Sequence, residues 1–310
     1  VKKSFSKIYN KMPINNILYK NILLKDTYDS INYNLIKIFK KSNPNYIKPN
    51  IICKKLVIYG TNLESNIDNN KYTSIVSYMI NIPNSFLYIM TGIILSDGNI
   101  NIITKNKKKK EGIITTTNSR LYLKQSINHS EYLLYVFNLL SHYCISIPKL
   151  KKSYLKGKLF YALEFYTRSL PCFTLLRNIF YIGRIKIIPI SKEYNSLHYN
   201  NINYDIYDLI NYESLAHIIM GNGAFQKGGG ITLNLQNFKL IELVHLINVL
   251  KVKFDLDCTI HKSRNKWVIY IKLHSVIKLF PHIKNFIVPN MKYKFKHKLF
   301  TWNDKNSFNN

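Results

Sequence analysis

The sequence predicts an α+β fold built from two similar halves. A helical motif occurs twice, as residues 90–98 (MTGIILSDG) and as residues 215–223 (LAHIIMGNG). After each copy, strand-like and helix-like segments follow in the same order. Because an internal repeat marks a repeated structural unit, we expect each half to contain a helix, two strands, a helix, two strands and a final helix.

Apolar periodicity and turn residues define the segments of each half. After its motif, the first half is expected to form a strand at 119–126, a helix at 131–142, strands at 148–154 and 159–167 around a Lys-Gly-Lys turn, and a helix at 170–180. The second half is expected to form a strand at 228–236, a helix at 240–252, strands at 257–262 and 266–272, and a helix at 275–286. The matching order indicates a pseudo-twofold arrangement within one chain.

The remaining segments set the expected domain boundaries. Residues 1–80 lie outside the repeat and are rich in Lys and Asn, so we expect a basic N-terminal extension with some helix. A polar, Tyr- and Asn-rich connector separates the two motif copies. The predicted organisation is an extension at 1–80, a first half at 81–190, a linker at 191–211, and a second half with its C-terminal tail at 212–310.

The charge of the chain predicts a nucleic-acid partner. The chain has 45 Lys and Arg residues against 16 Asp and Glu residues, a formal net charge of +29. An excess of this size calls for a polyanion nearby, most simply structured RNA or duplex DNA. We expect no membrane partner, because the sequence shows no basic amphipathic helix of membrane type and no apolar run long enough to span a bilayer.

The composition also indicates where the chain is made. Lys, Asn, Ile, Tyr and Phe are abundant, and their AT-rich codons are typical of many organellar genomes, which favours a mitochondrion or another organelle. Codon bias accounts for part of the Lys content but not for the scarcity of acidic residues. The four cysteines lack the spacing of a zinc site, so we expect buried, reduced thiols.

The paired motifs and the repeat order resemble the LAGLIDADG family of homing endonucleases and intron maturases. The first motif contributes Thr91-Gly92 and Asp97-Gly98, and the second contributes Leu215-Ala216 and Gly223. Further similarity lies at residues 123–126 (LKQS), 166–171 (YTRSLP), 231–238 (ITLNLQNF), 257–262 (DCTIHK), 268–272 (VIYIK) and 289–295 (PNMKYKF). The similarity does not extend to the N-terminal extension.

The resemblance implies a fold and a site. In this family the two motif helices pack side by side, which requires small residues such as Gly92 and Ala216. Two curved antiparallel sheets form a saddle over nucleic acid, and the acidic residue that ends each motif helix holds a divalent metal. Mg²⁺ takes one or two carboxylates together with water and phosphate oxygens, and it activates water for hydrolysis.

The two motif ends differ at the metal-binding position. Asp97 matches the family's acidic residue, whereas Asn222 replaces the second one with an uncharged amide. A carboxylate at a helix C-terminus needs a compensating cation, which favours Asp97 as a metal ligand. The loss of the second carboxylate weakens a hard-cation site, so Mg²⁺ is expected to bind weakly or at a single site.

Other site residues follow from repeat position. Lys124 corresponds to Asn234, where the family places polar residues around the metals, and Lys272 corresponds to Tyr166, near the cleaved phosphates. For both pairs, a generic sheet residue that faces nucleic acid is an equally good interpretation. His217, inside the second motif, is expected to be a packed core histidine. Residues expected to contact nucleic acid are Lys107, Lys108, Lys109, Lys110, Arg120, Lys124, Arg168, Lys262 and Arg264, although the run at 107–110 also fits a solvated hairpin tip.

Two functions fit these features. The chain is either an intron maturase or a basic RNA-binding component of a larger ribonucleoprotein such as an organellar ribosome, with double-strand cleavage lost or impaired. Alternatively, it is an active or nicking homing endonuclease that hydrolyses DNA phosphodiesters with Mg²⁺. Asn222 favours the first function, whereas the retained Asp97 favours the second. In either case we expect a monomeric chain with internal pseudo-symmetry.

Overall fold

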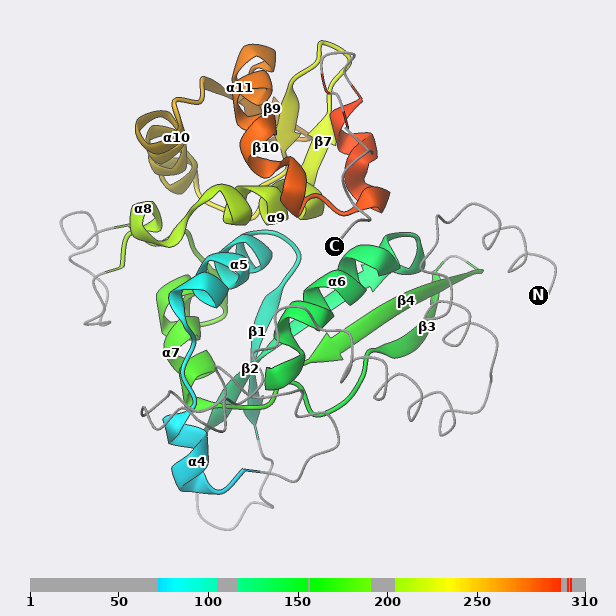
Figure 1. The fold of residues 1–310 in the computed structure, drawn as a ribbon, viewed down its shortest axis with the longest axis vertical. Helices are drawn as coiled ribbons and strands as arrows, with labels where there is room; N and C mark the ends of the chain where they lie inside the picture. Colours follow the sequence, from blue (N-terminus) through cyan, green and yellow to red (C-terminus); the bar gives the residue numbers. More distant parts are fainter. Residues whose placement is uncertain are drawn as a thin grey trace, which may run out of the picture. The chain divides into compact units, whose positions relative to one another are not determined.

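The computed structural model describes residues 72–104, 116–155, 157–190, 204–296, 300 and 302 (Figure 1). Most of the expected basic extension, the basic run at 107–110 and much of the expected linker therefore lie outside the described residues. Within the described part of the expected extension, one short helix, α4 (Ser74–Met79), follows its N-cap Thr73. No helix in the described ranges is long and apolar enough to cross a membrane.

The described residues form two compact units. The first unit contains the residues up to Asn81 together with Arg120–Leu170, and the second contains Ile82–Ser119 together with the residues from Pro171 onward. The second unit therefore includes both motif segments. This division does not follow the sequence repeat, and the boundaries predicted from the repeat stay a proposal.

The motif helices are α5 (Asn84–Leu95) and α9 (Tyr212–Asn222), which lie against each other in the second unit (Figure 1). Both are apolar over most of their length, and residues 89–95 of α5 and 214–220 of α9 are buried. A helix that is apolar on all sides must be covered on all sides, so these two form the centre of the unit's core. The Asn211 side chain begins α9 by accepting a hydrogen bond from the Ser214 backbone N–H at 2.8 Å.

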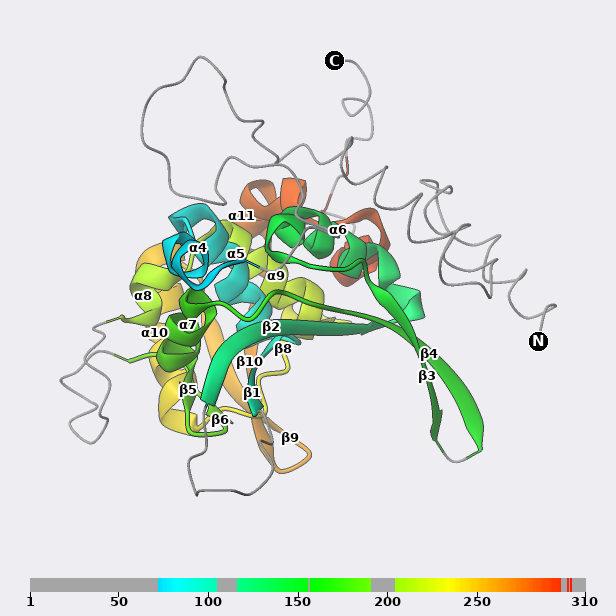
Figure 2. The ribbon, with the colours of Figure 1, turned by 90° about the horizontal axis from the view of Figure 1, so that it is seen from below.

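The first four-stranded sheet has the order β1-β2-β4-β3. Its strands are β1 (Asn99–Thr104), β2 (Thr116–Ser126), β3 (Lys149–Leu155) and β4 (Lys158–Tyr166). In the first unit, β2 and β3 pair antiparallel with β4, and Leu123, Leu163 and Phe165 are buried while Lys124 is exposed. Helix α6 (Ser130–Leu140) packs on β4, with the rings of Phe137 and Phe165 5.5 Å apart. Figure 2 shows β3 and β4 as a long, twisted hairpin.

The second sheet repeats this topology in the second unit, with the order β7-β8-β10-β9. Its strands are β7 (Gly223–Phe225), β8 (Ile231–Leu233), β9 (Cys258–Ser263) and β10 (Lys266–Ile271). All three pairings are antiparallel. Arg264 and Asn265 have positive φ angles of 52° and 60°, as a two-residue hairpin turn between β9 and β10 requires.

Three further helices complete the predicted order. They are α7 (Pro171–Phe180) after the first sheet, and α10 (Leu240–Phe254) and α11 (Leu273–Ile283) beside the second sheet. Features that were not predicted include a short helix, α8 (Ile206–Leu209), inside the expected linker, a small hairpin of β5 (Tyr181–Ile182) and β6 (Ile185–Lys186) after α7, and a 3₁₀ segment, η5 (Pro289–Phe295), after α11. The α+β class and the repeated element order are confirmed.

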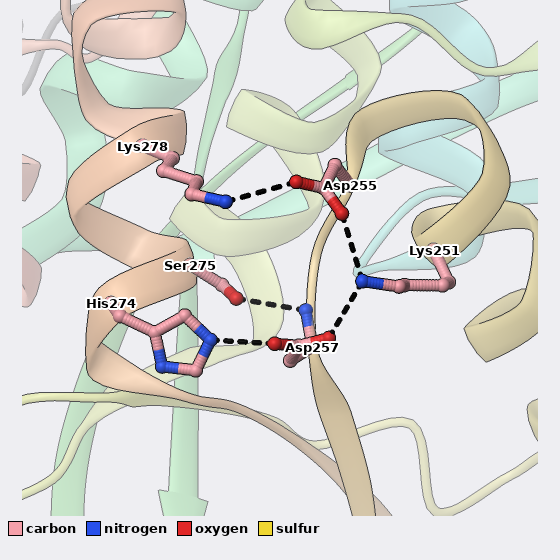
Figure 3. A network of polar contacts seen from close by, with 6 residues as sticks. All are labelled: Lys251, Asp255, Asp257, His274, Ser275 and Lys278. Carbon is pink, nitrogen blue, oxygen red and sulfur yellow. Dashed lines mark hydrogen bonds and ion pairs between the residues drawn. The ribbon is translucent and has the colours of Figure 1, made fainter.

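A polar network joins the end of α10 to the start of α11 (Figure 3). Lys251 Nζ lies 2.8 Å from Asp255 Oδ1 and 2.9 Å from Asp257 Oδ1. His274 Nε2 lies 2.6 Å from Asp257 Oδ2, and Lys278 Nζ lies 2.9 Å from Asp255 Oδ2. Hydrogen bonds with Lys251 and Lys278 lower the pKa of Asp255 to about 2, and those with Lys251 and His274 lower the pKa of Asp257 to about 2. These carboxylates are thus committed to local ion pairs.

Candidate functional site

The two motif helices approach each other through Gly92. A Cβ atom at Gly92 would lie 2.5 Å from the backbone oxygen of Ser214 and 2.7 Å from Cβ of His217. The Ser214 hydroxyl also donates a hydrogen bond of 2.9 Å to the backbone oxygen of Tyr88 in α5. His217 is fully buried in this contact, and burial lowers its pKa to about 3. His217 is therefore a neutral core histidine at physiological pH.

The ends of the motif helices also meet. The first helix ends where the Gly98 N–H donates to the Ile93 oxygen at 2.7 Å and the Ser96 hydroxyl donates to the Gly92 oxygen at 2.8 Å. A Cβ atom at Gly221 would lie 2.5 Å from Cβ of Ser96 and 3.4 Å from Oδ2 of Asp97. Asp97 therefore lies beside the last turn of α9, and Gly221 makes room for this approach.

A lysine from β6 reaches the end of the first motif helix. Lys186 Nζ donates to the Gly98 oxygen at 2.7 Å and to the Ser96 oxygen at 3.4 Å. Burial lowers the pKa of Lys186 to about 8, and attraction to the Asp97 carboxylate opposes this shift. An ammonium group at this place compensates both the negative end of the α5 helix dipole and the Asp97 carboxylate.

A second lysine, from η5, reaches the end of the second motif helix. Lys294 Nζ donates to the oxygens of Ile219 at 3.0 Å, Met220 at 2.6 Å and Gly221 at 3.2 Å. Burial lowers the pKa of Lys294 to about 8, and attraction to Asp97 again opposes the shift. The final segments after α7 and α11 thus each place a lysine against a motif-helix end.

The second motif end carries amides where the first carries a carboxylate. The Asn222 backbone oxygen accepts hydrogen bonds from the Asn234 backbone N–H at 2.9 Å and from Asn234 Nδ2 at 3.1 Å. The structure therefore brings Asn234 to the end of α9, where its repeat position predicts a site residue.

The donor set at the motif ends is poorer for a divalent cation than a pair of carboxylates would be. Mg²⁺ prefers carboxylate oxygens. Asp97 offers one carboxylate and Asn222 an amide, and the ammonium groups of Lys186 and Lys294 interact electrostatically with Asp97. Within the described ranges, no cluster of three or more His, Cys, Asp or Glu side chains could hold a metal ion.

On the first sheet, aromatic and charged side chains form a continuous row. The Arg120 guanidinium lies 4.1 Å from the Tyr166 ring centroid, and the Tyr166 and Tyr122 rings stack at 4.6 Å. Tyr122 donates a hydrogen bond of 3.1 Å to Glu164, whose other oxygen lies 3.4 Å from Lys151 Nζ. Burial and the Glu164 carboxylate raise the pKa of Tyr122, which stays a neutral donor. Arg120 and Tyr166 are therefore held in place by their neighbours in this row, within the first unit.

The other predicted residues occupy different environments. Lys124 is exposed on this sheet, in register with Glu164. Arg168 is only 7% exposed and lies 4.4 Å from the ring centroid of Tyr72, so it is a packing residue of the first unit. Lys272 is exposed just before α11.

The β9–β10 hairpin carries two further predicted contact residues. Lys262 lies 4.8 Å from the ring centroid of Trp267, and Arg264 is exposed in the turn. Lys262 and Arg264 are both exposed at the turn end of this hairpin. Lys107 to Lys110 lie outside the described residues.

Sequence reasoning missed Lys186 and Lys294. The only available signal was their shared context: each follows the last helix of its half and lies within five residues of a proline, Pro189 or Pro289. In a chain with 45 basic residues, two lysines with a structural role cannot be separated from those that face solvent. Their role depends on how the segments after α7 and α11 fold back to the motif helices, which the sequence does not show.

Comparisons with known proteins find similar sequences. The model of the LAGLIDADG DNA endonuclease family matches residues 87–279, more than half of the chain. The chain is 28% identical over 230 residues to cytochrome b mRNA maturase bI2 of Debaryomyces hansenii, covering 72% of this chain and 78% of that protein. It is 32% identical over 133 residues to intron-encoded endonuclease ai4 of Dictyostelium discoideum, covering 42% of this chain and 75% of that protein.

The fold is also similar to a solved structure. The homing endonuclease I-WcaI, solved bound to its DNA recognition sequence, matches with a TM-score of 0.54 and 23% identity. The match covers 90% of this chain and 98% of that chain. At this identity the likeness establishes the fold.

Proposed function

The chain belongs to the LAGLIDADG DNA endonuclease family, and we propose that it binds nucleic acid without efficient double-strand cleavage. The observation that carries this proposal is the difference between Asp97 and Asn222 at the two motif ends. Cleavage of both strands needs metal-held water and a stabilised leaving oxygen at each strand. One carboxylate beside two ammonium groups gives a donor set too poor in negative charge for that task.

The physiological ligand that we propose is a structured RNA. The similarity to cytochrome b mRNA maturase bI2 extends over most of both chains and supports a maturase role. The formal charge of +29 supports extensive phosphate contact. The Arg120–Tyr166–Tyr122 row and the exposed Lys124 and Arg264 supply contacts of the types that RNA-binding surfaces use.

The protein is proposed to act as a monomer in an organelle, either on its own intron RNA or inside a larger ribonucleoprotein. The intron-encoded relatives and the AT-biased composition support an organellar setting. Co-purification distinguishes the two roles, since a ribonucleoprotein component elutes with ribosomal RNA and a maturase with intron RNA.

A binding assay tests the proposed function. The purified full chain is titrated onto a folded group I intron RNA and onto duplex DNA of equal length at several salt concentrations. We expect tighter binding to the RNA, with affinity that falls steeply as salt rises. Replacing Lys124 and Arg264 together with Ala should reduce the salt slope by about 2, one for each lost phosphate contact, whereas Lys296→Ala serves as a control on an exposed lysine with no assigned role. Equal affinity for both nucleic acids overturns the RNA proposal.

A nicking endonuclease is the second candidate, and the retained Asp97 favours it. A single metal-binding carboxylate suffices for hydrolysis of one strand only. Conversion of supercoiled plasmid to the open circular form, dependent on Mg²⁺ and abolished by Asp97→Asn, supports this alternative.

A further inference from the structure

One face of the β3–β4 hairpin continues the core of the first unit. In the register of the hairpin, Tyr154 lies opposite Leu159. Because side chains alternate along a strand, Leu159 shares its face with Leu163 and Phe165. Leu163 and Phe165 are buried, and the ring of Phe165 lies 5.5 Å from that of Phe137 in α6. Tyr154 therefore lies on the same face of the sheet that α6 covers.

This face becomes exposed toward the turn of the hairpin. Burial falls along β4 from Leu163, which is fully buried, to Tyr161 and Leu159, which are half-buried. On β3, Lys152 is exposed and Tyr154 is 76% exposed. Figure 2 shows the turn end of the hairpin extending past α6. An aromatic surface thus continues from the core of the unit into solvent.

Cross-strand pairing leaves the Tyr154 ring available to a ligand. Tyr154 lies opposite Leu159, and Lys152 Nζ lies 6.0 Å from the ring centroid of Tyr161. Such pairs stabilise a hairpin. Because Tyr154 is 76% exposed, its contact with Leu159 covers only a small part of the ring. The rest of the ring can stack on another planar group.

The charge of the hairpin indicates which ligand fits. Residues 149–166 contain five lysines and one acidic residue, Glu164. The Glu164 carboxylate already accepts a hydrogen bond from Tyr122 and lies 3.4 Å from Lys151 Nζ. An apolar protein surface would leave the other lysines without a counter-charge, whereas a polyanion would neutralise them. Exposed rings between lysines therefore indicate nucleic acid rather than a protein partner.

An exposed ring fits an unpaired base better than a base pair. In a duplex each base is already stacked on its neighbours, whereas an unpaired base offers a whole face to an aromatic side chain. The Arg120–Tyr166–Tyr122 row lies on the opposite face of the same sheet, since Tyr166 follows Phe165 directly along β4. The two faces can therefore contact different parts of one nucleic acid.

We call the exposed surface the helix-side face; it consists of Lys152, Tyr154, Leu159 and Tyr161. We propose that the helix-side face binds a single-stranded segment of nucleic acid, with one unpaired base stacked on Tyr154 and one phosphate neutralised by Lys152. This inference rests on the proposed function, under which the segment belongs to the RNA ligand. The contact is additional to those proposed for the opposite face of the sheet.

Matched variants separate the two faces of the hairpin. Tyr154→Ala removes the exposed ring of the helix-side face, and Phe160→Ala removes a 48% exposed ring from the opposite face. Tyr154→Phe keeps the ring. Lys152→Met and Lys158→Met each remove one exposed lysine, the first from the helix-side face and the second from the opposite face. Far-ultraviolet circular dichroism confirms that the variants are folded.

The experiment measures binding of the full-length variants to an oligouridylate of about 12 nucleotides and to a duplex DNA, by fluorescence anisotropy in EDTA. Tyr154→Ala should bind the oligouridylate about tenfold more weakly than the unmodified chain, whereas Tyr154→Phe and Phe160→Ala should bind it equally well. Lys152→Met should reduce the salt slope for the oligouridylate by about 0.7, and Lys158→Met should leave it unchanged. Duplex affinity should be the same in Tyr154→Ala and the unmodified chain.

The outcomes separate this inference from the proposed function. An unchanged oligouridylate affinity in Tyr154→Ala, or an equal loss in Phe160→Ala, overturns the inference. An equal loss of duplex affinity in Tyr154→Ala also overturns it, because the ring would then not select unpaired bases. If the unmodified chain binds a folded group I intron RNA but not the oligouridylate, the inference fails and the proposed function stands. If it binds the oligouridylate as expected but does not prefer the intron RNA to duplex DNA, the helix-side face stands and the RNA proposal fails.

Discussion

The two motif helices are alike along their lengths and different at their ends. Along α5 and α9, small residues permit close approach, and residues 89–95 and 214–220 are buried. At the ends, Asp97 carries a carboxylate that interacts electrostatically with both Lys186 and Lys294, whereas Asn222 carries an uncharged amide. Helix packing and the chemistry of the motif ends therefore depend on different residues. The metal-binding position can change while the helix packing is retained.

The largest expected effect comes from disrupting the packing of α5 against α9, which is the feature that both motif helices share. Gly92→Val places side-chain atoms where Ser214 and His217 already lie, so we expect a loss of about 3 kcal/mol in the free energy of unfolding. Urea denaturation measures it. Gly228→Ala is the control, because a Cβ atom there meets nothing within 4 Å. Equal stability of the two variants would show that the helices are not in contact at Gly92.

The second prediction compares the two lysines. Lys294→Met leaves three carbonyl oxygens without their donor, whereas Lys186→Met leaves two. We expect losses of about 2 kcal/mol and about 1 kcal/mol respectively. Thermal and urea unfolding give the order of the two values. A larger loss of unfolding free energy in Lys186→Met would contradict the expectation that Lys294, with more hydrogen bonds, contributes more to stability.

The third prediction concerns His217 between the helices. Its pKa is about 3 in the folded chain and near 6.5 when unfolded, so the unfolded chain binds a proton that the folded chain does not. Stability is therefore complete above pH 6.5 and falls as the pH decreases toward 3. Between pH 6 and pH 5 we expect a loss of about 1 kcal/mol from this residue. His217→Leu should reduce the pH dependence of the free energy of unfolding by this amount. An unchanged pH dependence would show that another group takes up the proton on unfolding.

The smallest effect tests the network in Figure 3, away from the motif ends. The pKa values of Asp255 and Asp257 are depressed to about 2, so their contribution to stability is present above pH 4 and is lost as the pH falls toward 2. Both groups are exposed, and we expect only a slight flattening of the acid-unfolding curve in Asp257→Asn. A shift of that curve as large as the one expected from His217→Leu would contradict this ranking.

The sequence predicted most elements because each carries a periodic pattern of its own. The helix expected at 240–252 is α10 (Leu240–Phe254), and the hairpin expected at 257–272 is β9 and β10. The β5–β6 hairpin escaped prediction, because two-residue strands carry no periodic signal. Lys186 depends on that hairpin, so its site role was hidden together with it.

The structure places several of the candidate site residues, and their roles stay a prediction. Asp97, Asn222 and Asn234 were identified from the repeat, and the structure brings Asp97 beside α9 and Asn234 to the end of α9. Arg168 was predicted at the nucleic-acid surface, but its guanidinium lies over the ring of Tyr72, a residue far away in the sequence. Charge in a sequence reports what a side chain carries and not where the fold places it.

The most direct test of the central claim is a cleavage measurement. The purified chain is incubated with Mg²⁺ and a supercoiled plasmid library that carries randomised inserts, and the linear product is quantified and sequenced. The missing carboxylate at Asn222 predicts no linear product above that of Asp97→Asn. Efficient formation of linear DNA with defined ends would contradict the claim, because it would show that one carboxylate and two lysines suffice for cleavage of both strands.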